Sequence, residues 1–576
     1  MMNCPVRFIG KMFVHTEVNS VNIFKPLLLL LFITFIFALA GCQNEPADSG
    51  TSTPGTEAGY ADSIYHNGKI YTLDEQHSRA EAVAIKEGRF LAVGTDEEIL
   101  KLAGATTVQH DLGGRLALPG LHDAHFHLMA ALQTLDCNPG NFKWEQLRET
   151  LEYCKTQQVE GHPWLVINGL ELWHGTEGIS NDIVNEMFPD TPVMIRDASG
   201  HNRIVNDKAL ELAGIDNDTP DPQGGEIARD PKTGEPTGLL VELSAGFMAE
   251  LQVPPYPAEI VNQALEEILQ ALLALGITSI QDAYIYDVIL LESLANIDRQ
   301  GSPMPYTLVH LGWFYPEGKF RESLEATLRQ RERYATRHVS TEAVKVFIDG
   351  VPVPPKPTHV PILEDGTIDE THLLIPRPVL AQKFIEWDKA GLKIKMHTSA
   401  NGAARIGLDA IEAARNANGD SGLWHEITHA GDVHPADFPR FARLRAVAEI
   451  SPYFWHMGGM LGSTGYQFRS LYDAGALITA GSDNIILPSF NPFPPLQGIV
   501  ERGEEALPIE TALELFTRNG AISMNRLDDM GSIEAGKIAN MIVLDRNLLE
   551  IPASEIGATK VLKTILDGEV VHESDM

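Results

Sequence analysis

The middle of the chain alternates short apolar segments, which have the composition of buried strands, with longer segments of helical spacing. The predicted strands end near His127, Asp282, Gly312, Asp349, His397, His429, Pro452 and Asp483. Helices are predicted between them, for example over 259–275, 378–390 and 407–416. Strands joined by helical crossovers run parallel, and eight of them are typical of a (β/α)8 or TIM barrel. The sequence therefore predicts an α/β fold with this barrel as its main domain.

One interval in this pattern is too long for a single crossover. Residues 128–253 separate the first predicted strand from the second, and they contain strand-like segments of their own at 164–168 and 192–196. We therefore expect an inserted subdomain after the first barrel strand, within a barrel domain that covers 118–525.

Both flanks of the barrel are rich in short strands. Asn67-Gly68 lies between two strand-like runs, which predicts a hairpin, and Gly88 lies between two more. Further strand-like runs follow residue 540. We expect 61–117 and 526–576 to form one small β-sandwich domain together.

The N-terminal segment has the pattern of a targeting signal. Two lysines precede an apolar run over 27–39, which is short for a membrane span. Leu39-Ala40-Gly41-Cys42 follows and resembles the lipobox of bacterial lipoproteins. The resemblance implies a signal peptide over 1–41, a lipidated Cys42 and a flexible tether over 42–60. The alternative is an uncleaved anchor helix with an incidental cysteine.

The resemblance also implies a compartment. Gln43 follows the cysteine, where Asp commonly signals retention in the inner membrane, so we expect anchoring at the outer membrane or periplasmic face, with the cell surface as a further possibility. After processing, Cys137 and Cys154 would remain, and they could form one disulfide or stay as free thiols.

The charge of the chain bears on its partners. The formal net charge is −34 and the isoelectric point is near 4.9. Nucleic acid binding needs a basic surface, so this composition argues against a nucleic acid partner. We expect a small-molecule substrate, a membrane anchor at Cys42 and, as an open possibility, a homo-oligomer.

The first predicted barrel strand carries a possible metal-binding pair. It ends in His125-Phe126-His127, and side chains alternate across a strand, so Asp123, His125 and His127 are predicted to share one face. Two imidazoles on one face can bind the same metal ion, although a His-x-His pair alone is often structural.

Other ligand-type residues occur at later strand ends. They are Lys345 on strand four, His397 on strand five, His429 on strand six and Asp483 on strand eight. The carboxyl ends of barrel strands meet at one face, so these side chains are predicted to converge. Taken singly, each histidine could be a core residue and Asp483 could be a helix cap.

The fourth predicted barrel strand carries a lysine, Lys345, among apolar residues. Alternation puts Val344, Val346 and Ile348 on one face and Lys345, Phe347 and Asp349 on the other. A lysine that points into the barrel would be costly as an unpaired ammonium. Reaction with carbon dioxide would convert it into a carbamate anion that can bridge two cations. A surface or ion-paired lysine is the alternative.

The motifs together resemble the amidohydrolase superfamily, and within it the YtcJ-like metal-dependent hydrolases that include N-substituted formamide deformylases. The resemblance covers nearly all of 61–573. It rests on the segments 118–127, 197–201, 238–242, 276–283, 344–350, 427–430, 480–483 and 531–537. It implies the barrel beside a β-sandwich that is described above. It also implies a site for two divalent ions, zinc in our expectation, held by His125, His127, carboxylated Lys345, His397, His429 and Asp483.

The sequence departs from that family pattern in two places. Ala400-Asn401 stands where many relatives have Gly-Asp, and Asn484-Ile485 stands where relatives usually have Ala-Pro. No proposed ligand is lost, so the departures bear on the substrate more than on the chemistry.

The function implied is hydrolysis of an amide or another non-peptide C–N bond by a metal-activated hydroxide. Asp483 would act as general base and acid, and His429 or His201 would help to bind the developing oxyanion. Other residues predicted to contact the substrate are Trp173, His174, His201, Arg203, Trp455 and His456. Two alternatives remain open: a solute-binding protein on an inactive scaffold, and the same metal site acting on esters, lactones or phosphoesters.

Overall fold

The computed structural model describes residues 59–172, 179–315, 319–456, 466–484 and 489–574. The predicted signal peptide and Cys42 therefore lie outside the described residues. Within the described ranges, no helix is long and apolar enough to cross a membrane.

The central sheet has eight strands, and each neighbouring pair in it runs parallel. The strands, in chain order, are β8 (Leu121–Phe126), β15 (Ile277–Ile285), β16 (Tyr306–Gly312), β17 (Val339–Phe347), β18 (Lys393–His397), β19 (His425–Thr428), β20 (Ala446–Ile450) and β21 (Leu477–Ala480). Every predicted barrel strand is present, which confirms the α/β class and the (β/α)8 barrel.

The first and last strands of this sheet lie next to each other. The N–H of Asp483 donates to the carbonyl of His125 (2.7 Å), and the N–H of Ser482 donates to the carboxylate of Asp123 (3.0 Å). Gly481 permits this approach, since a Cβ there would lie 2.4 Å from the backbone nitrogen of His125. The strand ends that carry His125 and Asp483 are thus held in fixed register.

Amphipathic helices cover the barrel. In α7 the buried residues Leu265, Leu269 and Leu272 recur at helical spacing, while Glu266 and Glu267 are exposed. The helices that follow the barrel strands are α7 (Ala258–Ala274), α8 (Val288–Arg299), α9 (Lys319–Arg329), α10 (Arg377–Lys389), α11 (Asn401–Asn418), α12 (Phe438–Leu444), α13 (Pro452–His456), α14 (Phe468–Asp473), α15 (Phe493–Val500), α16 (Ile509–Leu515) and α17 (Arg518–Ser523). The helix predicted over 407–416 begins earlier, at Asn401.

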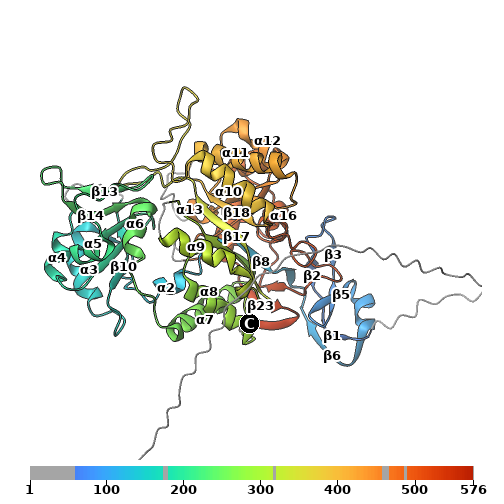
Figure 1. Ribbon diagram of the computed structural model, residues 1–576. Helices are drawn as coiled ribbons and strands as arrows, with labels where there is room; N and C mark the ends of the chain where they lie inside the picture. The colour runs from blue at the N-terminus through green and yellow to red at the C-terminus, as the bar shows by residue number, and fades with distance from the viewer. Residues whose placement is uncertain (1–58, 173–178, 316–318, 457–465, 485–488, 575–576) are drawn as a thin grey trace, which may run out of the picture. The chain divides into compact units, whose positions relative to one another are not determined.

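The interval after β8 forms a sheet of its own. Its strand order is β13-β14-β12-β11-β10-β9, and Figure 1 shows β10, β13 and β14 gathered with α3 to α6, apart from the barrel strands β17 and β18. The bounds are α2 (Ala130–Gln133), β9 (Phe142–Lys143), α3 (Leu147–Cys154), β10 (Leu165–Glu171), α4 (Asp182–Met187), β11 (Val193–Asp197), β12 (Arg203–Val205), α5 (Asp207–Ala213), β13 (Glu226–Arg229), β14 (Pro236–Val241) and α6 (Glu242–Glu250). Cys137 and Cys154 form a disulfide here, which decides between the two alternatives left open by the sequence.

The two flanks of the barrel share two further sheets. One has the order β5-β4-β1-β6, and the other, β24-β23-β22-β7-β2-β3, joins N-terminal and C-terminal strands. The bounds are β1 (Ala61–His66), β2 (Lys69–Tyr71), β3 (Arg79–Ala80), β4 (Ala82–Lys86), β5 (Arg89–Gly94), α1 (Asp96–Ile99), β6 (Ala103–Asp111), β7 (Leu116–Pro119), β22 (Met541–Leu544), β23 (Val561–Leu566) and β24 (Glu569–Glu573). In Figure 1, blue β1 and β5 and red β23 mark these two ends of the chain.

The hairpin predicted at Asn67-Gly68 is wrong. β1 pairs with β4 and β6, whereas β2 pairs with β3 and β7, so the turn carries the chain from one sheet to the other. Tyr65 of β1 and Ile70 of β2 meet in one core between the sheets. Burial of both side chains between two layers outweighs the local preference for pairing. The second predicted hairpin, β4 to β5 around Gly88, is confirmed.

A charged cluster joins the turn between β23 and β24 to the barrel. His338, directly before β17, contacts Asp298 of α8 through Nδ1 (2.6 Å) and Asp567 of that turn through Nε2 (2.8 Å). Arg337 also pairs with Asp567 (2.8 Å), and Tyr306 donates to it (2.6 Å). Although burial opposes the charge, the two carboxylates raise the pKa of His338 from 6.5 to about 9.

This cluster predicts a pH-dependent stability. The folded pKa of His338 is raised, so its contribution to stability is fully present below pH 6.5 and is lost as the pH rises through about 9. We expect the destabilisation caused by His338→Gln, measured by urea unfolding, to be large at pH 6 and small at pH 9.5. His572→Gln, in β24 of the same sheet, is the matched control. An equal effect of His338→Gln at both pH values would contradict the account.

Candidate metal centre

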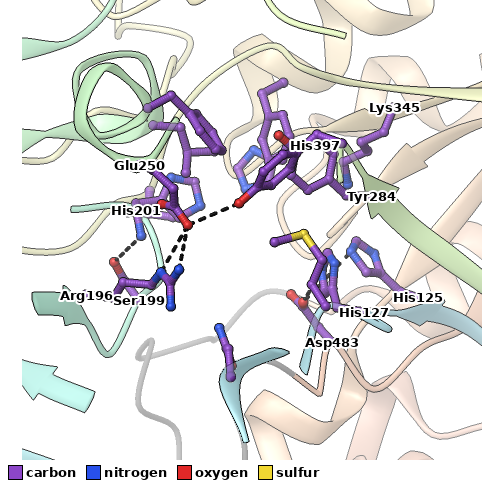
Figure 2. A pocket seen from close by; sticks show the side chains of 18 of the residues that line it. His125, His127, Arg196, Ser199, His201, Glu250, Tyr284, Lys345, His397 and Asp483 are labelled. Atoms are coloured by element: carbon purple, nitrogen blue, oxygen red, sulfur yellow. Dashed lines mark hydrogen bonds and ion pairs between the residues drawn. The ribbon is translucent and has the colours of Figure 1, made fainter. Parts of the chain in front are cut away.

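The carboxyl ends of the barrel strands and the inserted sheet enclose a cavity of about 550 Å³. Figure 2 shows His125, His127 and Asp483 grouped together, with Lys345 and His397 nearby and His201, Ser199 and Glu250 of the inserted region across from them. All of the predicted metal ligands line this cavity: His125, His127, Lys345, His397, His429 and Asp483.

The predicted substrate contacts are divided. His201 and Arg203 line the cavity. Trp173 and His174 lie outside the described residues. Trp455 and His456 are the last two residues of α13, and the structure describes their backbone but not their side chains. Asp123 is buried but is not among the lining residues, and its carboxylate accepts the N–H groups of His125 (3.0 Å) and Ser482. The structure therefore does not bring Asp123 to the cavity with His125 and His127.

Three histidine nitrogens converge on the carboxylate of Asp483. His127 Nε2 lies 2.9 Å from Oδ1, His125 Nε2 lies 3.8 Å from the same oxygen, and His429 Nε2 lies 3.8 Å from Oδ2. His125, His127 and Asp483 each offer one ligand atom, and these three atoms lie within 4.8 Å of one another. Metal bonds to nitrogen and oxygen are about 2.0–2.2 Å long, so a single ion can reach ligand atoms at such separations.

His429 lies between this group and His397. Its ring centroid is 4.7 Å from that of His125 and 4.9 Å from that of His397. Its Nδ1 contacts the hydroxyl of Ser451 (3.2 Å), which leaves Nε2 directed to Asp483. Burial holds the pKa of His125, His397 and His429 well below the usual value. Neutral imidazole is the form that binds metals, so this donor set fits divalent transition ions.

Lys345 points into the cavity, as the alternation in strand four predicts. Val344, Val346 and Ile348 belong to the hydrophobic core, whereas Lys345 and Phe347 line the cavity. The lysine is 1% exposed, and no carboxylate in the described ranges forms an ion pair with it. Burial, with a smaller effect of Lys395, lowers the pKa of Lys345 to about 7.

The sequence reasoning missed Glu449. This fully buried residue of β20 contacts His125 Nδ1 through Oε2 (2.7 Å), and burial raises its pKa to about 8. By occupying Nδ1 it directs Nε2 of His125 toward Asp483, as a residue behind a metal ligand does. The signal was a single carboxylate in an otherwise apolar strand, Ala446–Ile450.

The inserted region contributes two arginines and two carboxylates to the cavity wall, and these groups form ion pairs with one another. Arg203 Nε donates to Glu250 (2.7 Å), and Arg196 pairs with Glu250 (2.8 Å) and with Asp136 (2.6 Å). Tyr286 donates to the same glutamate (3.1 Å). Two guanidinium groups are thus balanced by two carboxylates at the cavity wall.

The residues that depart from the family pattern, Ala400-Asn401 and Asn484, make contacts at or near the cavity. The side chain of Asn484 accepts the N–H of His127 (2.7 Å) and donates to its carbonyl (3.3 Å), so it fixes the backbone of a predicted ligand. Ala400 lines the cavity, and Asn401 accepts the N–H of Ile362 (2.8 Å). Ile485 lies outside the described residues.

A sequence model described as the amidohydrolase family matches residues 110–572. The chain belongs to this amidohydrolase family. It is 28% identical over 544 residues to an N-substituted formamide deformylase of Arthrobacter pascens, covering 88% of this chain and 97% of that protein. It is 27% identical over 560 residues to the putative amidohydrolase YtcJ of Bacillus subtilis, covering 88% and 99%. The resemblance found in the sequence is thereby confirmed at the level of the family.

Solved structures agree on the fold. An uncharacterized metal-dependent hydrolase of Pyrococcus horikoshii superposes with a TM-score of 0.63 at 20% identity, covering 86% of this chain and 99% of the other. At that identity the likeness bears on the fold alone. Family membership and the converging donor set together make this amidohydrolase a hydrolase that depends on a divalent metal.

Proposed function

We propose that this amidohydrolase cleaves an amide or a related non-peptide C–N bond of a small molecule, with zinc as its metal and N-substituted formamides as the first substrates to test. The observation that carries the proposal is the approach of His125, His127 and His429 to one carboxylate, that of Asp483. The name of the Arthrobacter relative supports the choice of formamides.

The proposed metal would be held by His125, His127, His397, His429 and Asp483, together with Lys345 as a carbamate. When bound, such ions lower the pKa of a water molecule and polarise a carbonyl group. The residues around the site supply the rest of the chemistry. Glu449 keeps His125 oriented, and the clamp of Asn484 on His127 fixes the second histidine of the pair.

Asp483 is the proposed proton carrier. Its backbone has φ of 48°, a strained conformation for a residue with a side chain, and the hydrogen bond to His125 maintains it. A carboxylate oxygen of Asp483 takes a proton from the attacking water as the C–O bond forms. It then gives this proton to the nitrogen as the C–N bond breaks, so the products are a carboxylic acid and an amine.

Replacing Asp483 tests this role. Asp483→Asn retains the shape but cannot accept the proton, so we expect kcat to fall by about 10²–10⁴-fold on the best substrate. Steady-state kinetics on a panel of N-substituted formamides and matched esters would measure it, with Asp473→Asn on the surface of α14 as the control. Undiminished activity of Asp483→Asn would contradict the proposal, and a preference for the esters would redirect it to that bond.

The surroundings of Lys345 support the proposal that it is carboxylated. A buried ammonium without an ion-pair partner is costly, whereas a carbamate beside His397 and His429 would be a metal ligand. In this step the neutral amine nitrogen attacks carbon dioxide, an N–C bond forms, and one proton is released.

Isotope labelling tests this modification. Protein reconstituted with zinc and ¹³C-bicarbonate is expected to show a carbamate resonance in its ¹³C NMR spectrum, and Lys345→Met is expected to lack it. Lys389→Met, at the end of α10, is the control and retains the signal. Identical spectra of wild type and Lys345→Met would rule out a carbamate at this residue.

We also propose that lipidation of Cys42 anchors the protein to a bacterial membrane. The support is the lipobox-like sequence Leu39-Ala40-Gly41-Cys42 and the Ser-, Gly- and Pro-rich stretch that follows it. In cells that process lipoproteins and are fed labelled palmitate, the wild-type chain is expected to carry the label and Cys42→Ser is expected to lack it. A wild-type chain without label, or equal labelling of Cys42→Ser, would contradict the proposal.

A further inference from the structure

A buried acid–base pair lies in the inserted region, beside the metal centre. His201 follows β11, and Glu242 is the first residue of α6. His201 Nδ1 lies 2.6 Å from Glu242 Oε1, and both side chains are buried. The His201 ring lines the cavity with its centroid 5.1 Å from the ring of His397. Within the described part of the chain, no residue forms a hydrogen bond with Nε2 of His201.

The contacts of Glu242 are those of a carboxylate. Besides His201, it accepts the N–H of Leu243 (2.9 Å) and the hydroxyl of Thr358 (2.7 Å). Although burial opposes ionisation, His201 and these donors lower the pKa of Glu242 to about 2. Since the carboxylate only accepts, the hydrogen in the His201 contact belongs to Nδ1.

The backbone around Glu242 is adapted to this contact. Its φ of 72° is strained for a residue with a side chain, and its N–H donates to the side chain of Asn202 (3.1 Å). Gly350 leaves the space that the carboxylate occupies, because a Cβ at Gly350 would lie 1.9 Å from Oε2. The strained backbone of Glu242 and the lack of room for a side chain at position 350 together indicate that the position of the Glu242 carboxylate is closely specified.

The loop that carries His201 is fixed independently. Asp197 accepts the hydroxyl of Ser199 (2.6 Å) and the N–H of Asn202 (2.9 Å), and Ser199 in turn accepts the N–H of His201 (3.2 Å). The segment Asp197–Asn202 is therefore a self-bonded turn. It presents the imidazole to the cavity, and Glu242 sets the rotation of its ring (Figure 2 shows the position of His201).

We propose that Glu242 is a positioning residue that holds His201 with Nδ1 toward the protein and Nε2 toward the reacting amide group of the substrate. The inference rests on the proposed hydrolase function, and it makes the inserted region part of the active site. A purely structural contact within the insert would not need to leave one imidazole nitrogen unbonded at the cavity surface.

Kinetics on the metal-loaded full chain test the role. We expect His201→Asn to lower kcat by about 10²-fold, the lower end of the effect of losing a side chain that transfers a proton at the reacting group, because Nε2 of the Nδ1-protonated ring can accept a proton there. Glu242→Gln should lower kcat by at least about 10-fold, with KM and metal content nearly unchanged. Residues that act through one another are non-additive, so the double variant should be no worse than His201→Asn alone.

Glu226→Gln is the matched control. Glu226 pairs with Lys356 at the surface (2.6 Å), so this change also removes a glutamate that links the insert to the segment that contains Thr358. It should leave kcat and KM near wild type. The inference would be overturned if the fold-losses of kcat from Glu242→Gln and His201→Asn multiplied in the double variant. It would also be overturned if Glu242→Gln had the kcat of the wild type. Absence of turnover by the wild type on the whole panel would instead mean that the proposed hydrolase function fails.

A second measurement does not need turnover. Proton NMR of protein labelled with ¹⁵N-histidine should show a strongly downfield Nδ1 proton from the short contact to Glu242. The signal should disappear in both His201→Asn and Glu242→Gln and persist in Glu226→Gln. A histidine spectrum unchanged by Glu242→Gln would show that the glutamate does not hold the ring, and the inference would be wrong.

Discussion

The contact of Asp483 with His125 and His127 is the interaction on which the site depends. It joins the carboxyl ends of the last and first barrel strands, β21 and β8, and it exists only because the sheet brings these strands together. Gly481 allows the backbones to approach, and the hydrogen bond from Asp483 N–H to the carbonyl of His125 fixes their register. Closure of the barrel and assembly of the ligand set are therefore one event.

The polar layer beneath the site supports that arrangement. Lys395, fully buried on β18, contacts both the carbonyl of Ala124 and Glu426 at 2.5 Å. Glu426 also pairs with Lys393 at 2.5 Å, so one carboxylate is shared by two lysines inside the barrel. Loss of Glu426 would leave both buried ammonium groups without this partner, and breaking a buried ion pair in this way typically costs about 3–5 kcal/mol. The strand that carries His125 is thus held by charge as well as by its backbone ladder.

Much of this could be predicted from the sequence because the signals were local. Alternation in strand four placed Lys345 toward the cavity, and polar residues at successive strand ends marked the ligand set. The features that the sequence did not predict correctly, or did not predict at all, depend on residues far away in the chain. The Asn67-Gly68 turn was recognised, but the choice of neighbour for β2 is made by a core shared with the C-terminal strands. Glu449 has no motif, and it gains its place only through contact with His125. The pairing of Cys137 with Cys154 depends likewise on how α3 packs.

Metal content per chain, determined by elemental analysis on protein purified without chelator, is the direct test of a binuclear metal centre in this cavity. We expect about two divalent transition-metal ions for each chain, because the donor set extends from His127 to His397 with His429 between them. A single ion would limit the site to the group around Asp483. No bound metal, even after reconstitution with zinc and bicarbonate, would contradict the account of this cavity as a metal centre.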